Sequence, residues 1–145
     1  MASELYRKGM EEMRKHLGPQ ADRYVENIRE ISPEFAKVNV EFPFGELYTR
    51  DILDDKTREL CTVAALTVQG FSTPELKIHV QAALNCGASR VEIVEVIYPN
   101  DRLLWLSRRN QRSDGHESGL RRTGFMTLFL LRKIIFHFPW ILQGS

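Results

Sequence analysis

A series of helix start and stop signals between residues 53 and 98 constrains the fold more than any other part of the chain. Asp54 and Asp55 lie where helix N-cap acids belong, and the segment that follows, CTVAALTV at residues 61–68, is apolar almost all round. Because a helix that is apolar on every side is a buried one, we expect this helix to lie in the core. Gly70 is its expected C′ residue, since glycine adopts the left-handed conformation at little cost.

Two further helices in this region begin with the Ser-x-x-Glu spacing of a capping box, in which a hydroxyl and a carboxylate bind the first free backbone N–H groups. The paired residues are Ser72 with Glu75 and Ser89 with Glu92. Gly87 lies between the two helices and is expected to end the first. Three short helices with marked ends in under fifty residues predict a compact all-α bundle.

The N-terminal part of the chain is also predicted to be helical. Residues 3–17 have apolar positions at helical spacing, and residues 20–31 form a second amphipathic segment. Ser32 followed by Pro33 starts a third helix, which Pro43 and the nearby glycine are expected to break or kink. Because no strand-like alternation is sustained in the first 98 residues, this part is predicted to be all-α.

The order of several short motifs resembles the carboxymuconolactone decarboxylase family. The motifs are LDDKTREL (53–60), AALT (64–67), ELKIHV (75–80), AALNCG (82–87) and IVEVIY (93–98), and FPFGELYTRDIL (42–53) extends them upstream. The resemblance covers about two thirds of the chain and implies a helical bundle of the alkylhydroperoxidase-like type. It also implies a carboxy-lyase of aromatic-acid catabolism, which releases CO₂ from 4-carboxymuconolactone to give 3-oxoadipate enol-lactone. No metal or organic cofactor is implied.

Two residues are candidate catalytic groups. His79 lies on an apolar helix face, where a core histidine bonded to a carbonyl is the simpler interpretation, but the resemblance places the ELKxH histidine at the active site. A histidine can move a proton near neutral pH. Glu59 either favours the dipole of its helix from the first turn or faces the pocket as a buried acid, and the resemblance favours the pocket. If the two helices pack antiparallel, both side chains approach one cavity.

Arg50 and Arg58 are candidate substrate-binding residues, because a guanidinium group binds a carboxylate through two hydrogen bonds. A surface ion pair is the alternative for each. Cys61 and Cys86 show no metal-ligand spacing, and the segment before His79 lacks the Cys-x-x-Cys pair of related redox proteins. A disulfide relay is therefore unsupported, and Cys61 is expected to be an inert core residue. A redox or stress protein of the same superfamily and a non-catalytic helical oligomer remain alternative functions.

The chain carries opposite net charges in its two parts. Residues 1–98 hold 12 Lys/Arg and 16 Asp/Glu, a net charge of −4, whereas residues 99–145 hold 8 and 3, a net charge of +5. No apolar signal segment opens the chain, and two distant cysteines suit a reducing compartment, so a cytoplasmic protein is expected. The expected partners are a small-molecule substrate and further copies in a trimer or hexamer, with no nucleic acid and no membrane.

Residues 99–145 form an atypical tail after a domain of residues 1–98. The tail begins polar, rich in arginine and without clear helical periodicity, and then becomes apolar from residue 125. Charged residues and a proline interrupt the apolar part, so it falls short of the roughly 18 residues that a membrane-spanning helix needs.

One hypothesis is that an extra base at the Pro99 codon has shifted the reading frame of this tail. With permitted codons, the neighbouring frame over residues 99–123 can read QMTVYCGFPGAINGVMAMKAAFGE, a helix-forming string that resembles the usual ending of the family. A shifted tail was not selected to pack on the core, so its basic charge is no evidence of a nucleic-acid partner.

We predict that the coding DNA over residues 99–123 consists of codons compatible with this alternative reading. Restoring the frame should raise the melting temperature, because each large apolar side chain covered by the restored helix contributes roughly 1.5–3 kcal/mol. DNA sequencing identifies the codons, and thermal unfolding measures the change in melting temperature. Codons incompatible with the alternative string would exclude the hypothesis, and deletion of residues 99–145 should not reproduce the gain.

Overall fold

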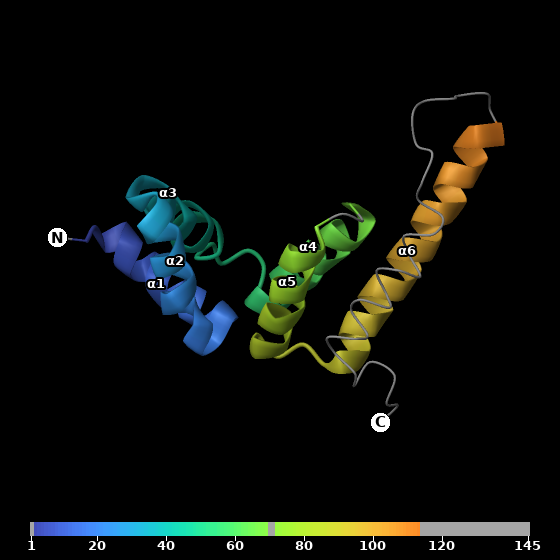
Figure 1. The fold of residues 1–145 in the computed structure, drawn as a ribbon. Coiled ribbons are helices and arrows are strands. Elements are labelled where there is room, and N and C mark those ends of the chain that lie inside the picture. Colours follow the sequence, from blue (N-terminus) through green and yellow to red (C-terminus); the bar gives the residue numbers. More distant parts are fainter. Residues whose placement is uncertain (1, 70–71, 114–145) are drawn as a thin grey trace. The chain divides into compact units, whose positions relative to one another are not determined.

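The structure is a computed structural model that describes residues 2–69 and 72–113. All regular elements in these two ranges are helices, so the predicted all-α class is confirmed (Figure 1). The chain divides into two compact units. The first unit consists of Met1–Glu59 with Gln81–Ala88, and the second of Leu60–Val80 with Ser89–Ser145.

The first unit contains a succession of helices that begins at the N-terminus. Its elements are α1 (Glu4–Leu17), the 3₁₀-helix η1 (Gly18–Gln20), α2 (Ala21–Ile31), α3 (Pro33–Val40) and the π-helix η2 (Glu41–Leu47). Ser3 caps α1 by accepting a hydrogen bond from Tyr6 N, and Ser32 caps α3 in the same way from Phe35 N. The three helices expected before residue 43 are therefore confirmed, and so is the predicted start signal of the third at Ser32.

The end of α3 differs from a simple break. The α-helix ends at Val40, but the chain continues to wind through Pro43 as the π-helix η2. Tyr48 N donates to Pro43 O over 2.9 Å, which is the i to i+5 bond of this wider turn. A proline lacks one N–H donor, so it removes the regular α-helical bond without preventing the wider winding.

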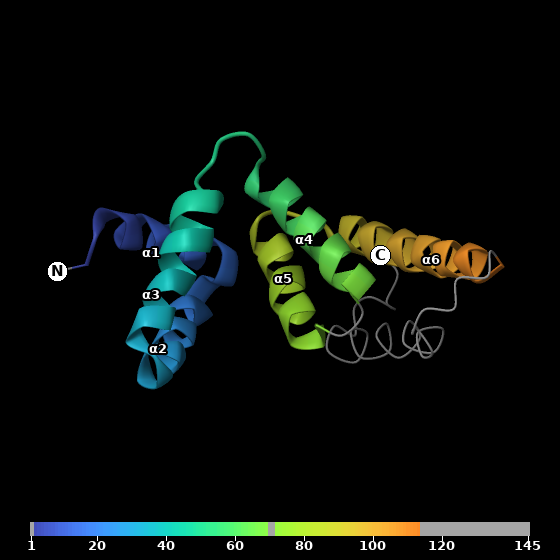
Figure 2. The same cartoon turned by 90° about the horizontal axis from the view of Figure 1, so that it is seen from above.

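Two glycines allow α1 to approach the α3–η2 segment closely. Both views show α1, α2 and α3 packed together (Figures 1 and 2). A Cβ atom added to Gly9 would lie 2.4 Å from Val40 O, and one added to Gly45 would lie 2.9 Å from Leu5 O. The core beside this contact consists of Met10, Met13, Ala21, Val25, Ala36 and Val40.

The remaining helices are α4 (Asp55–Gln69), α5 (Thr73–Asn85) and α6 (Arg90–Ser113). Asp54 caps α4 by accepting from Thr57 N over 2.6 Å. The second predicted capping box is present in full, because Ser89 N donates to Glu92 Oε2 and Glu92 N donates to Ser89 Oγ. Gly87 has φ +90° at the predicted helix end, a conformation that favours glycine. In the described part of the second unit, the buried apolar side chains are Val63, Leu76, Val80, Ile93 and Ile97.

The expectation that residues 61–68 are buried on every side is wrong. Val63 and Thr67 are buried, whereas Cys61 is exposed and Val68 is 36% exposed. One face of α4 is buried and the opposite face is exposed, although both faces are apolar. An apolar sequence fixes which faces can be buried, but the neighbouring elements decide which faces are buried.

The helix α6 extends further than the sequence pattern suggested. It continues through Pro99 to Ser113, where no helical periodicity was expected. A proline inside a helix removes one backbone hydrogen bond, and here the Asn100 side chain donates to Val96 O over 2.7 Å in the same turn. The predicted domain boundary at residue 98 stays a prediction. Gly70 and the tail beyond residue 113 lie outside the described residues.

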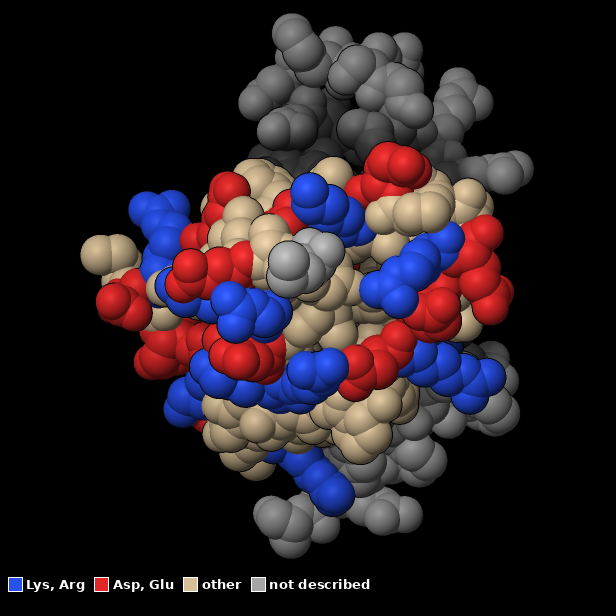
Figure 3. Space-filling view, turned by 90° about the vertical axis from the view of Figure 1, so that its left-hand side faces the viewer, with Lys and Arg blue, Asp and Glu red and all other residues tan. Residues whose placement is uncertain are grey.

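Charged side chains of both signs are interspersed over the face drawn in Figure 3. Ion pairs among the described residues include Arg14 with Asp22 at 2.6 Å and Lys37 with Glu41 at 3.8 Å. Among the described helices, none has the length and hydropathy that crossing a membrane requires.

We predict that Gly9→Ala destabilises the chain, since its new methyl group would clash with the Val40 carbonyl. Overpacking of this kind costs about 1–3 kcal/mol, which urea unfolding would measure. The matched control is Lys8→Ala on the same helix, because Lys8 is exposed and its substitution should leave the unfolding midpoint unchanged. Equal stability of both variants would contradict the close contact.

Candidate functional site

The centre of the candidate site is His16, whose side chain is completely buried. It lies on the core face of α1, in line with Gly9, Met13 and Glu12, which are also buried. The imidazole ring packs edge-on against Tyr48, with ring centroids 4.7 Å apart. A polar ring at this depth needs hydrogen-bond partners, because burying it alone is costly.

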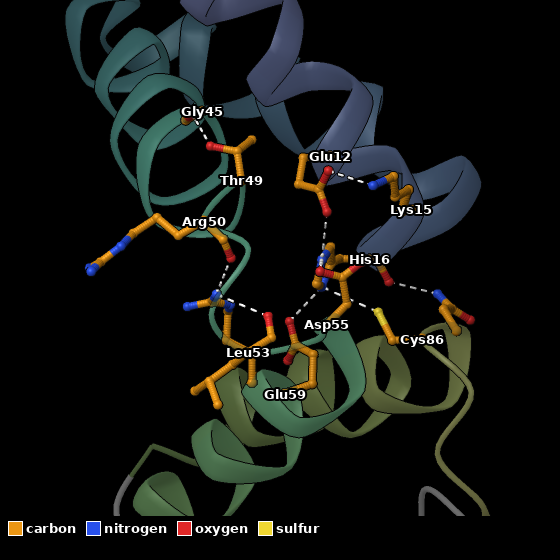
Figure 4. Close-up of polar contacts among 12 residues, drawn as sticks. Glu12, Lys15, His16, Gly45, Thr49, Arg50, Leu53, Asp55, Glu59 and Cys86 are labelled. Atoms are coloured by element: carbon orange, nitrogen blue, oxygen red, sulfur yellow. Dashed lines mark hydrogen bonds and ion pairs between the residues drawn. The ribbon is translucent and has the colours of Figure 1, made fainter.

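Three carboxylates surround the imidazole ring of His16 (Figure 4). Glu59 Oε1 lies 2.7 Å from Nδ1, whereas Glu12 Oε1 lies 3.3 Å and Asp55 Oδ1 3.9 Å from Nε2. Glu12 and His16 are four residues apart on α1, and Asp55 and Glu59 are four residues apart on α4. Each helix therefore presents two of the four side chains from successive turns of one face.

The end of α5 closes the group from another direction. Cys86 Sγ lies 3.4 Å from His16 Nδ1. The neighbouring Asn85 donates from Nδ2 to the backbone carbonyl of His16 over 2.7 Å. The side chains of Glu12, His16, Asp55, Glu59 and Cys86 are called the His16 cluster below.

The surroundings of His16 favour its charged form. Burial alone lowers the pKa of the imidazole, but the hydrogen bonds and charges of Cys86 and Glu59 outweigh burial and raise the pKa to about 10. At neutral pH the ring is therefore an imidazolium that donates from Nδ1 to Glu59 and from Nε2 toward Glu12. The hydrogen bond from Lys15 Nζ to Glu12, 2.7 Å long, likewise raises the pKa of Lys15.

A pocket of about 800 Å³ adjoins the His16 cluster in the first unit. Its lining consists of Lys15, Asp54, Asp55, Lys56, Asn85, Cys86 and Gly87. Asp55 and Cys86 belong to both the lining and the cluster, so they connect the buried histidine with the open pocket. The lining holds two lysines and two aspartates, so its formal charges balance.

Of the predicted catalytic residues, Glu59 is 1% exposed, which agrees with the expected buried acid. The structure pairs it with His16, a residue that the sequence did not single out. His79 is half-buried on α5 and belongs to the second unit. The expected approach of His79 to Glu59 stays a prediction. The catalytic roles of His79 and Glu59 also stay predictions.

The two predicted arginines have different surroundings. Arg58 donates from Nη2 to the carbonyls of Arg50 and Leu53, at 2.8 and 3.1 Å, and its guanidinium lies 5.7 Å from the centre of the Tyr48 ring. These contacts hold the loop before α4. The Arg50 side chain is exposed and points away from the His16 cluster (Figure 4). Substrate binding by either arginine stays a prediction.

The cysteines also differ from expectation. Cys61 is exposed, so its assignment to the core is wrong. Cys86 is half-buried and touches His16, which sequence analysis missed. The spacing of Gly9, Met13 and His16 along one face of α1 is a sequence signal that could have placed the histidine in the core.

We predict strong coupling between His16 and Glu59 in a double-mutant cycle with His16→Leu and Glu59→Leu. Each single variant leaves the other charge buried without this partner, which costs about 3–5 kcal/mol. The double variant should therefore lose less stability than the sum of both. Urea unfolding of the four proteins measures the coupling.

The control is the same cycle at Arg14 and Asp22, an equally close pair with exposed side chains. Solvent screens that pair, so no measurable coupling is expected there. If both cycles gave the same coupling, the buried ion pair at His16 would be refuted.

Comparison with known proteins places this chain in a family. The sequence profile of the carboxymuconolactone decarboxylase family matches residues 33–124, a range that includes Glu59 and Cys86 and extends past Tyr98. A 4-carboxymuconolactone decarboxylase of Acinetobacter baylyi is 32% identical over 93 residues, which is 63% of this chain and 69% of that protein. An uncharacterised 15.0 kDa protein of Paracoccus denitrificans is 34% identical over 90 residues, which is 61% of this chain and 67% of that protein. The chain belongs to the carboxymuconolactone decarboxylase family.

Proposed function

We propose that the chain is a carboxy-lyase that releases CO₂ from 4-carboxymuconolactone and gives 3-oxoadipate enol-lactone. The family and the Acinetobacter baylyi relative support this substrate class. The observation that carries the proposal is Glu59, a carboxylate buried to 1% exposure and hydrogen-bonded to His16 beside an open pocket. Buried and strongly coupled ionisable groups are typical of active sites.

The reaction needs an electron acceptor and a proton. Departure of CO₂ leaves an electron pair that the lactone carbonyl accepts, and a proton must then reach the product. In this proposal Glu59 and His79 manage the proton and position the lactone, as the family motif implies. His16 holds the Glu59 carboxylate in one orientation through the 2.7 Å contact at Nδ1.

The substrate also needs cationic partners for its carboxylates. In this proposal Lys15 and Lys56, which line the pocket, supply them, and Lys15 also pairs with Glu12 at 2.7 Å. Arg58 is less suited, because its Nη2 already binds two loop carbonyls. The Arg50 side chain is exposed and points away from the His16 cluster, so carboxylate binding by Arg50 stays a prediction.

A peroxide-reducing thiol enzyme is the second candidate. The observation in its favour is the 3.4 Å contact between Cys86 Sγ and His16 Nδ1, since a neighbouring imidazolium activates a thiol. Peroxide consumption that disappears in Cys86→Ser, without any CO₂ release by the unaltered chain, would favour this function.

The expected trimer or hexamer is part of the proposal. Ile31 at the end of α2, Phe35 and Val38 in α3, and Phe42 in η2 are between 54% and 88% exposed. Exposed apolar side chains of this kind commonly lie in subunit contacts, and light scattering would test for them.

We predict that the purified chain releases CO₂ from 4-carboxymuconolactone and that Glu59→Gln and His79→Ala each lower kcat by roughly 10²–10⁴. Circular dichroism should show unchanged helix content in the His79 variant. Cys61→Ser is the matched control, because Cys61 is exposed two residues further along α4 and should leave turnover unchanged.

Absence of CO₂ release by the unaltered chain would overturn the proposed reaction. Full turnover in both Glu59→Gln and His79→Ala would instead leave the reaction in place and refute the assignment of its residues.

A further inference from the structure

We propose that the His16 cluster binds one divalent transition-metal ion of the zinc class, with His16, Asp55 and Cys86 as ligands and Glu12 as a fourth donor. The sequence shows no metal motif, because these residues are spread from position 12 to position 86. The fold of the first unit brings them together from α1, the start of α4 and the end of α5. The proposal does not depend on the decarboxylase assignment.

The distances between the donor atoms fit a single ion. One ligand atom each from His16, Asp55 and Cys86 can be chosen so that all lie within 4.8 Å of one another. Ligand bonds of about 2.0–2.1 Å in a tetrahedral site separate N and O donors by roughly 3.3 Å. Glu12 Oε1 lies 3.3 Å from His16 Nε2, and Asp55 Oδ1 lies 3.9 Å from it. Small side-chain rotations would bring these oxygens onto one ion.

The second ring nitrogen of His16 is held as in established metal sites. Glu59 Oε1 accepts a hydrogen bond from Nδ1 over 2.7 Å. A ligating histidine almost always donates its other N–H to a carboxylate or carbonyl, which fixes the ring and directs the opposite nitrogen toward the metal. Asn85 adds a further restraint by binding the His16 carbonyl.

The sulfur ligand of Cys86 distinguishes the proposed site from a magnesium or calcium site. Cys86 Sγ lies 3.4 Å from Nδ1 of His16 and belongs to the set of donor atoms that lie within 4.8 Å of one another. A mixed set of imidazole, carboxylate and thiolate is typical of zinc, whereas magnesium and calcium prefer oxygen ligands alone. Asp55 and Cys86 both line the pocket of about 800 Å³, which gives an ion a path from solvent.

The charges of the cluster favour a cation at this point. Glu12 and Glu59 are buried, at 7% and 1% exposure, and Asp55 is the third carboxylate near the same ring. A metal ion would replace the Nε2 proton of His16, and its two positive charges would offset the converging carboxylates. His16 and Glu12 precede the family match at residues 33–124, so the site follows from this chain's own residues.

The test is titration of the chelator-treated full chain with Zn²⁺ in a calorimeter, followed by absorption spectroscopy with Co²⁺. We expect one Zn²⁺ per chain, and a cobalt spectrum with the charge-transfer band that a thiolate ligand produces. Asp55→Asn should weaken Zn²⁺ binding by at least about tenfold. Loss of a residue that only supports a ligand already lowers metal affinity by about this factor, and loss of the ligand itself should lower it further. Cys86→Ser should remove the charge-transfer band, and Zn²⁺ should shift the Nε2 resonance of His16 in NMR spectra.

The matched control is Asp54→Asn. Asp54 neighbours Asp55 and lines the same pocket, but it lies outside the His16 cluster, and asparagine preserves its capping of α4. Its affinity for Zn²⁺ should equal that of the unaltered chain. The proposal is overturned if the unaltered chain does not bind Zn²⁺, if Asp54→Asn loses as much affinity as Asp55→Asn, or if Cys86→Ser keeps the cobalt band.

Discussion

The buried contact between His16 and Glu59 organises the first unit. Both side chains are removed from water, and a charged pair at this depth persists only when its geometry is good and further partners are present. Those partners come from separate segments: Glu12 from α1, Asp55 from α4 and Cys86 from the end of α5. Displacing any of these segments would remove partners from a buried charge, so the pair makes their arrangement specific even where its net contribution to stability is small.

Most helix starts in this chain could be predicted because they depend on local chemistry. The caps at Ser32, Asp54 and Ser89 each involve residues no more than three positions apart. The features that were missed depend on packing. Whether Cys61 faces a neighbour or solvent is decided by the elements around α4. The continuation through Pro43 as a π-helix depends on which longer hydrogen bonds the backbone can still form.

The candidate site could be predicted only in part for the same reason. Glu59 was identified because its motif is local and matches a family. His16 was missed because its partners Glu59 and Cys86 lie 43 and 70 positions away, and no sequence spacing encodes such contacts. The apolar face of α1 does predict that a residue at position 16 is buried. It cannot tell which carboxylate will meet the ring.

The pocket beside the cluster has a charge balance that bears on both proposals. Its two lysines, Lys15 and Lys56, are matched by two aspartates, Asp54 and Asp55, so the lining is neutral by formal charge. A substrate with more than one carboxylate gains little attraction from a neutral lining, because the aspartates repel what the lysines attract. A divalent ion bound at His16 and Cys86 would displace the Nε2 proton of the imidazolium and the proton of the thiol, so its two positive charges would leave the net charge of the cluster unchanged. Metal binding at the cluster would therefore not by itself attract an anionic lactone, so the proposed metal site and the proposed decarboxylase activity stand independently of each other.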